Sequence, residues 1–256
     1  MIVAAAQEQI EDVVVGARGT LTWLGHATVL LTTMSGTRVI FDPWLENPAS
    51  PITMDDLGVV DVIAVTHGHF DHMGSAVALA GATNAPLVCV PEMASYFATQ
   101  GVTTALEMNK GGTVRLADVS LTMVGADHSC GVAAGEGLPD IYGGNPVGFV
   151  AHLPAGEGGP IYVSGDTNVF SDMNIIRELY RPQTALMPID GHYNMGPREA
   201  AYATTLLGVS RFVPYHYGTF PVLAGTPEQL REEMAAISSP ASLAVITPGQ
   251  SVPLSA

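Results

Sequence analysis

The chain has 256 residues, 47% hydrophobic and 13% charged, so it is long enough to bury a substantial core within one large domain. Twenty-four acidic residues oppose nine basic ones, and the formal net charge of −15 disfavours binding to the phosphate backbone of nucleic acids. The two cysteines, Cys89 and Cys130, provide no disulfide framework and fit a reducing compartment.

The N-terminal segment begins with apolar residues but has no feature of a secretory signal. Residues 1–15 include Glu8, Glu11 and Asp12 and contain no basic residue. No uncharged apolar run reaches the roughly 18 to 20 residues that a membrane span requires. We therefore expect a cytoplasmic protein without a membrane span, in which residues 1–256 form a single domain and residues 1–19 form its peripheral N-terminal segment.

The first half of the chain is predicted to alternate between strands and helices. Short β-like runs separated by Gly, Asn, Asp and Pro predict strands at residues 21–23, 28–32, 38–41, 59–65, 86–90, 113–116 and 120–126. Helical patterns predict helices at residues 74–79 and 92–100.

A dense group of possible metal ligands follows the apolar run at residues 62–65. Thr66 to His72 reads Thr-His-Gly-His-Phe-Asp-His and so places three imidazoles and one carboxylate within seven residues. Neutral imidazole suits zinc, iron and similar metals, and a carboxylate can bridge two cations or hold a water. Gly68 allows the backbone to bend. The alternative is a solvated loop whose histidines cap the next helix, but four such ligands seldom crowd together without an ion.

The second half repeats the alternation after a long Gly-rich loop. Residues 131–144 are predicted to form this loop, either a functional lid near His128 or a disordered segment. Strands are predicted at 148–153, 160–163, 184–188, 211–214 and 242–246, and helices at 198–207 and 227–237. The last helix begins with the capping pattern Thr226-Pro227-Glu228. This order indicates an α/β fold, and mixed sheets with outer helices would satisfy it.

Three later positions place ligand chemistry at predicted strand ends. Asp127 and His128 end one apolar run, Asp166 follows a second, and His216 follows a third. A single histidine at a strand end is more often a hydrogen-bonded structural residue. The joint occurrence of these positions with the Thr66–His72 motif is much more specific.

At this point the sequence resembles the metallo-β-lactamase superfamily, whose THxHxDH motif appears here without departure as Thr66 to His72. The resemblance implies a four-layer αββα sandwich, with two mixed β-sheets flanked by helices and built of two related halves. It also implies two divalent cations, zinc first, with manganese or iron as alternatives. Under the family pattern, His67, His69 and His128 would hold one cation, Asp71, His72 and His216 the other, and Asp166 would bridge them.

Further segments resemble one branch of this superfamily, which contains ascorbate-6-phosphate lactonase, N-acylphosphatidylethanolamine phospholipase D and uncharacterised metal-dependent hydrolases. They are Trp23-Leu-Gly-His-Ala-Thr-Val-Leu, Phe41-Asp-Pro and residues 188–197. Within them, His26, Asp42 and Asp190 are candidates for contacting substrate or orienting a metal-bound histidine. His192 is a candidate catalytic residue at the pocket mouth. The alternatives are a structural hydrogen bond for His26, a turn aspartate for Asp42 and a surface position for His192.

The expected activity is hydrolysis by a hydroxide that bridges the two cations, with Asp71 orienting it or relaying its proton. The expected partner is a small-molecule substrate, a lactone, ester or amide, and a homo-oligomer is compatible with the sequence. The alternatives are a phosphodiesterase of the same fold, a diiron redox enzyme and a non-catalytic metal-binding sensor domain. No cluster of Arg or Lys adjoins the ligand loops, which disfavours the phosphodiesterase.

Overall fold

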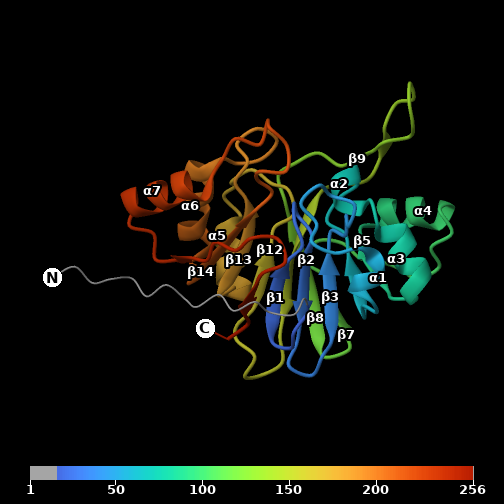
Figure 1. Cartoon of the computed structure of the whole chain (residues 1–256), viewed down its shortest axis with the longest axis horizontal. Coiled ribbons are helices and arrows are strands. Elements are labelled where there is room, and N and C mark those ends of the chain that lie inside the picture. The colour runs from blue at the N-terminus through green and yellow to red at the C-terminus, as the bar shows by residue number, and fades with distance from the viewer. Residues whose placement is uncertain (1–15, 256) are drawn as a thin grey trace.

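In the computed structural model, which describes residues 16–255, two seven-stranded β-sheets pack against each other as a sandwich. The sandwich lies between two groups of helices (Figure 1). Helices α1 to α4 lie outside the first sheet, and α5 to α7 lie outside the second. This arrangement confirms the predicted α/β class and the αββα order of layers. The predicted peripheral segment at residues 1–19 lies mostly outside the described residues.

The first sheet combines an antiparallel half with a parallel half. Its strands pair antiparallel from β16 to β3 and parallel from β3 to β6. In spatial order they are β16 (Ser251–Pro253), β1 (Thr20–Trp23), β2 (Val29–Thr32), β3 (Arg38–Phe41), β4 (Val62–Ala64), β5 (Leu87–Cys89) and β6 (Ala105–Glu107).

The second sheet has the same plan. Its strands pair parallel from β15 to β12 and antiparallel from β12 to β7. In spatial order they are β15 (Ser242–Leu243), β14 (Arg211–Tyr215), β13 (Thr184–Pro188), β12 (Ile161–Val163), β11 (Val147–His152), β8 (Val119–Gly125) and β7 (Thr113–Leu116). The shared plan agrees with two related halves.

The helices bury one apolar face each against the sheets. Those beside the first sheet are α1 (Met54–Leu57), α2 (Phe70–Met73), α3 (Ala76–Thr83) and α4 (Pro91–Thr99), and those beside the second are α5 (Met173–Tyr180), α6 (Pro197–Leu207) and α7 (Pro227–Ala236). The capping pattern predicted for α7 is present, because the Thr226 side chain accepts a hydrogen bond from the Gln229 N–H. The helix predicted at 74–79 begins two residues later, as α3.

Two hydrophobic cores hold the layers together. The larger fills the space between the sheets, where Phe41 and Phe149 meet with their ring centroids 6.2 Å apart, and continues under the helices of the first sheet to Leu79 and Phe97. The smaller lies between the second sheet and α5 to α7, and includes Tyr162, Ile176 and Phe212. Strands β4 and β13 are buried throughout, which explains why their sequences are continuous apolar runs rather than alternating ones.

The strand directions gather seven loops at one end of the sandwich. In the first sheet β1, β3 and β4 run in the same sense, and in the second β8, β12, β13 and β14 do, because two antiparallel steps restore the direction. The loops that follow these strands carry every site residue predicted from the sequence. Ligand sites of α/β sheets commonly lie beyond the carboxyl ends of such strands.

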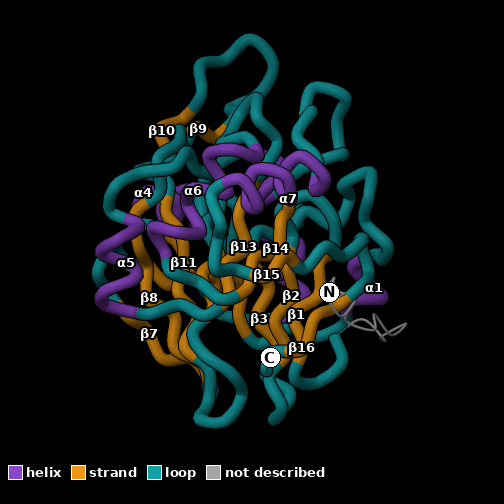
Figure 2. The backbone as a smooth tube through the Cα atoms, turned by 90° about the vertical axis from the view of Figure 1, so that its left-hand side faces the viewer, coloured by secondary structure: helices purple, strands orange, loops and turns teal. Residues whose placement is uncertain are grey.

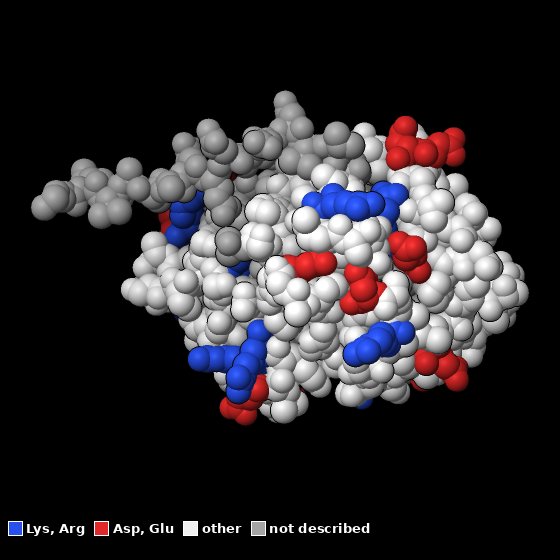
Figure 3. Space-filling view, turned by 90° about the horizontal axis from the view of Figure 1, so that it is seen from below, with Lys and Arg blue, Asp and Glu red and all other residues white. Residues whose placement is uncertain are grey.

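The Gly-rich segment is not the unbroken loop that its composition predicts. Its ends form a short antiparallel ladder between β9 (Gly131–Val132) and β10 (Ile141–Tyr142), and the intervening residues project from the end of the sandwich (Figure 2). Within residues 16–255, no helix combines the length and the apolarity needed to cross a bilayer. Acidic and basic side chains are interspersed on the opposite end of the molecule (Figure 3).

Candidate metal centre

Three overlapping groups of His and Asp side chains lie at the loop-bearing end. Within each group, one ligand atom from every member lies within 4.8 Å of the others. The groups are His67, His69 and His128; His26, Asp71, His72 and His216; and His67, His72 and Asp166.

The first group joins the start of the Thr66–His72 motif to the loop after β8. Nε2 of His67 lies 2.9 Å from Nδ1 of His69, and the His128 ring centroid lies 5.2 and 5.1 Å from theirs. Burial lowers the pKa of all three imidazoles, so they favour the neutral form that binds metals. The turn between His67 and His69 requires glycine, because a Cβ on Gly68 would lie 2.6 Å from Cγ2 of Val132.

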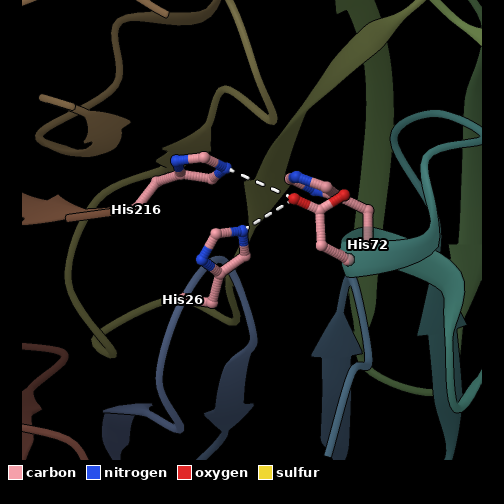
Figure 4. A group of neighbouring side chains, drawn as sticks. His26, His72 and His216 are labelled. Carbon is pink, nitrogen blue, oxygen red and sulfur yellow. Dashed lines mark hydrogen bonds and ion pairs between the residues drawn. The ribbon is translucent and has the colours of Figure 1, made fainter. Parts of the chain in front are cut away.

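The second group converges on the carboxylate of Asp71. Figure 4 shows His26, His72 and His216 close together, with His26 in the turn between β1 and β2, His72 on α2 and His216 in the loop after β14. Oδ2 of Asp71 lies 2.9 Å from Nε2 of His26 and 3.8 Å from Nε2 of His216. The rings of His72 and His216 are nearly parallel, with centroids 5.6 Å apart.

Asp166 lies between the two groups. Its Oδ1 is 3.2 Å from Nε2 of His72, and its Oδ2 is 3.2 Å from Nε2 of His216 and 3.7 Å from Nε2 of His128. The sharp turn after β12 delivers it there, since Gly165 has φ +62° and its Cα packs against Thr66. Asp166 is thus the carboxylate that contacts both sides of the cluster.

Asp42 fixes the orientation of His72. Its carboxylate accepts hydrogen bonds from the N–H and the hydroxyl of Thr66 at 2.8 and 2.7 Å, and from Nδ1 of His72 at 2.8 Å. The other ring nitrogen of His72 therefore points at Asp166. Burial alone would lower the pKa of His72, but the charges of Asp166 and Asp42 raise it to about 10.

Asp190 lies beside His216 at an ion-pair distance, in a position similar to that of Asp42 beside His72. Its Oδ2 lies 3.1 Å from Nδ1 of His216, while its Oδ1 accepts hydrogen bonds from the backbone N–H groups of His192, Tyr193 and Asn194. The loop after β13 thereby holds the carboxylate in place. Carboxylates that hold the far nitrogen of a histidine orient the near nitrogen toward a metal.

Three of the seven described residues other than glycine that have positive φ belong to this cluster. His26, Asp42 and His216 all have positive φ, at +51°, +47° and +56°. Such conformations cost on the order of 1–3 kcal/mol for residues other than glycine and persist where the surrounding structure enforces them. A backbone hydrogen bond from His216 N–H to the His26 carbonyl, 3.0 Å long, joins two of the strained residues directly.

The chemistry of the cluster fits divalent cations. Among the described residues, His72 Nε2, His216 Nε2 and Asp166 Oδ1 are buried, and the 3.2 Å contacts of the two nitrogens with the Asp166 carboxylate lack the geometry of hydrogen bonds. Unpaired buried polar atoms are rare and costly, and all three belong to ligand types that zinc, iron and manganese accept. A bound cation would satisfy them.

A cavity of about 700 Å³ opens onto the cluster. Its wall includes six residues predicted from the sequence: His26, His69, Asp71, His128, Asp166 and His216. The wall also includes Gly131, Ala133 and Asp140, from the segment predicted as a possible lid, and six residues that were not predicted: Phe70, Ser129, Tyr193, Phe220, Val222 and Leu223. The loop sequence after His216 has no feature that marks Phe220 or Val222 as pocket residues.

His192 stands apart from the other candidates. Its side chain is exposed, and its ring packs edge-on against Tyr193 with centroids 4.6 Å apart. Within the described part of the chain, its ring makes no hydrogen bond to the cluster, and Tyr193 rather than His192 lines the cavity. Its catalytic role therefore stays a prediction without a supporting contact. His152, at the end of β11 and outside the cavity wall, bonds Thr122 with its Nε2 2.9 Å from the hydroxyl.

Known proteins share this sequence and fold. Residues 37–217 match a family model described as a beta-lactamase superfamily domain. A UPF0173 metal-dependent hydrolase of Koribacter versatilis is 48% identical over 213 residues, covering 83% of this chain and 90% of that protein. A UPF0173 metal-dependent hydrolase of Rubrobacter xylanophilus is 42% identical over 242 residues, covering 94% and 98%. Igni18, a metallo hydrolase from the archaeon Ignicoccus hospitalis, is 30% identical with a TM-score of 0.80, covering 91% and 97%.

Proposed function

Because the chain belongs to the beta-lactamase superfamily and to its UPF0173 metal-dependent hydrolases, we propose that it hydrolyses a small lactone, ester or amide with two divalent cations. The observation that carries the proposal is the position of Asp166. This single buried carboxylate contacts His72 and His216 on one side and His128 on the other.

The ligand assignment follows the two groups of side chains. His67, His69 and His128 would hold one cation, and Asp71, His72 and His216 the other, with Asp166 shared between them. Zinc suits this set of imidazoles and carboxylates, and manganese and iron are compatible with it. Asp42 and Asp190 hold the far nitrogens of His72 and His216, so both imidazoles present the near nitrogen to the cluster.

When bound, divalent cations would lower the pKa of a coordinated water to about 7 and so supply a nucleophile at neutral pH. Water is then added across the acyl bond, giving an acid and an alcohol or amine. Asp71 is placed to accept the proton and pass it to the leaving group, because its carboxylate lines the cavity. Burial alone would raise its pKa, but the nearby His216 imidazole and the hydrogen bond from His26 hold the pKa of Asp71 well below its usual range.

The open cavity favours an enzyme over a sensor domain. A purely structural metal site is closed by protein ligands, whereas a catalytic site keeps an accessible position. Here His69, Asp71, His128 and Asp166 all face a space of about 700 Å³, which is large enough for a small-molecule substrate.

The test is turnover by metal-loaded protein. We expect hydrolysis of at least one member of a panel of γ-lactones, simple esters and amides, followed by proton release. His67→Ala and His216→Ala should abolish it, while His152→Ala, far from the cavity, should not. If protein with two bound equivalents of zinc, manganese or iron turns over no member of the panel, the proposed function is wrong.

A further inference from the structure

One wall of the cavity is apolar and exposes large side chains to water. Phe70, Phe220, Val222 and Leu223 form it, and Phe70 and Val222 are 59% and 40% exposed. Phe70 occupies the second open position of the THxHxDH motif, between His69 and Asp71. Its side chain is therefore adjacent in sequence to two candidate metal ligands. Large exposed apolar groups inside a concave site typically mark a surface that a ligand covers.

This wall is held rigidly against the cluster. Trp44 packs edge-on against Phe70 with ring centroids 5.5 Å apart, and stacks on Phe220 with centroids 6.1 Å apart. His26, the hydrogen-bond partner of Asp71, lies 5.9 Å from Phe220 and 5.3 Å from Trp44, again between ring centroids. The aromatic surface therefore extends from His26, which bonds Asp71, to Phe220 and to the exposed ring of Phe70 on the cavity wall. A ligand group on it would lie next to the reacting atoms.

The charged groups on the cavity wall are acids and histidines. Asp71, Asp140 and Asp166 line the cavity, and none of the described residues that line it is Lys or Arg. Asp140 comes from the end of the projecting segment, immediately before β10. Phosphoryl groups are commonly recognised by Arg and Lys, so beyond the bound cations a phosphodiester would find no cationic side chain among the described lining residues and would face the carboxylate of Asp140.

We propose that the substrate is an uncharged ester, lactone or amide bearing an apolar group of several carbon atoms. This inference rests on the hydrolytic function proposed above. The apolar group lies on the wall formed by Phe70, Phe220 and Val222, with the scissile carbonyl at the metal cluster. Phosphodiesters and acyl compounds without the apolar group are poor substrates. The apolar wall thus acts as the specificity determinant of the site.

Two neutral substrate series test this assignment by kinetics. One consists of γ-butyrolactone, γ-hexalactone and γ-octalactone, and the other of the ethyl esters of acetic, butyric and hexanoic acids. We expect kcat/KM to rise along each series, by up to about fourfold for each buried methylene group. Phe220→Ala should flatten the rise, whereas Leu179→Ala, an exposed apolar residue on α5 outside the cavity, should not change it.

Binding to metal-free protein provides a readout that does not depend on turnover. Acetamide, butyramide and hexanamide are uncharged and differ only in chain length, and Trp44 reports occupation of the wall through its fluorescence. We expect affinity to increase along this series, and the signal to disappear in Trp44→Phe but not in Trp23→Phe. Equal affinities for the three amides would overturn the inference.

The kinetic results separate this inference from the proposed function. No turnover of either series by metal-loaded protein would contradict the hydrolase itself, while the amide titration still decides the role of the wall. Turnover that does not depend on chain length, or faster cleavage of bis-p-nitrophenyl phosphate, would overturn the inference and leave a metal-dependent hydrolase standing.

Discussion

His26 and Asp71 are 45 positions apart in the chain, yet Nε2 of His26 lies 2.9 Å from Oδ2 of Asp71. The other ring nitrogen of His26 lies 3.0 Å from the Thr219 hydroxyl. The ring of His26 also packs on that of His216, with centroids 3.9 Å apart. One buried imidazole therefore connects the β1–β2 turn, the metal motif and the loop after β14, and it fixes the direction of a carboxylate that would bind a cation.

The first prediction concerns this contact. His26→Asn should weaken binding of the cation held by Asp71, His72 and His216 by about 10- to 100-fold, because loss of a partner that orients a ligand has effects of this size. Asparagine is chosen because it tolerates the positive φ at this position. Titration with zinc against a competing chelator measures the two affinities.

Thr219→Val is the matched control, because it removes only the hydrogen bond to the other nitrogen of His26. It should have a smaller effect of the same sign. Unchanged affinity for both zinc equivalents in His26→Asn would show that Asp71 needs no support from His26.

The second prediction separates the two cation positions. His67→Ala and His216→Ala should each lower metal content by about one equivalent, since they belong to different groups of ligands. Asp166→Ala should lower both affinities, because its carboxylate contacts members of both groups. Elemental analysis of protein purified without added metal provides the count, with His152→Ala as the control that retains full content. Full loading of both histidine variants would contradict the ligand assignment.

The sequence predicted the fold and the cluster for a physical reason. Each ligand follows a buried strand, and an apolar run that ends in a polar group is recognisable from the order of residues alone. Asp166 and His216 were predictable in this way, after Val163 and Tyr215, and the resemblance to a known family supplied the pairing between distant loops. Their convergence depends on strand directions, which periodicity does not reveal.

The apolar wall was not predictable by the same reasoning, whereas the residues that contact the ligands, His26, Asp42 and Asp190, were already candidates for that role. Phe70 and Phe220 have no strand-end position and no ligand chemistry, and only their packing on Trp44 identifies them as a surface. The short ladder between β9 and β10 was missed because each strand has two residues, too few to show alternation. Helix α5 was also missed, although its residues are amphipathic.

The third prediction is that metal removal lowers the melting temperature. Under the proposed function, the native cluster would bind cations that the unfolded chain cannot hold in the same geometry, so binding should stabilise the folded state by an amount that grows with free metal concentration. Calorimetry before and after chelation, with metal content verified in the same samples, measures the difference. An unchanged melting curve in protein shown to be metal-free would mean that the ions contribute nothing to stability.

The fourth prediction concerns Gly165, the residue that turns the chain into Asp166. Its φ of +62° suits glycine, and a Cβ there would lie 2.7 Å from Cβ and Oγ1 of Thr66, whose hydroxyl bonds Asp42. Gly165→Ala should therefore destabilise the protein by roughly 2–5 kcal/mol, since an unfavourable backbone conformation adds to overpacking. It should also weaken metal binding, because Thr66 and Asp42 hold His72.

Gly101→Ala separates these two effects. Gly101 also has positive φ, +86°, but a Cβ there would meet no atom within 4 Å. We therefore expect only the backbone contribution, about 1 kcal/mol, and unchanged metal affinity. Urea unfolding of the two variants and the wild type gives the free energies of unfolding. An equal decrease in the free energy of unfolding in the two variants would mean that Thr66 moves aside at little cost. The turn before Asp166 would then not be what keeps Asp42 and His72 in position.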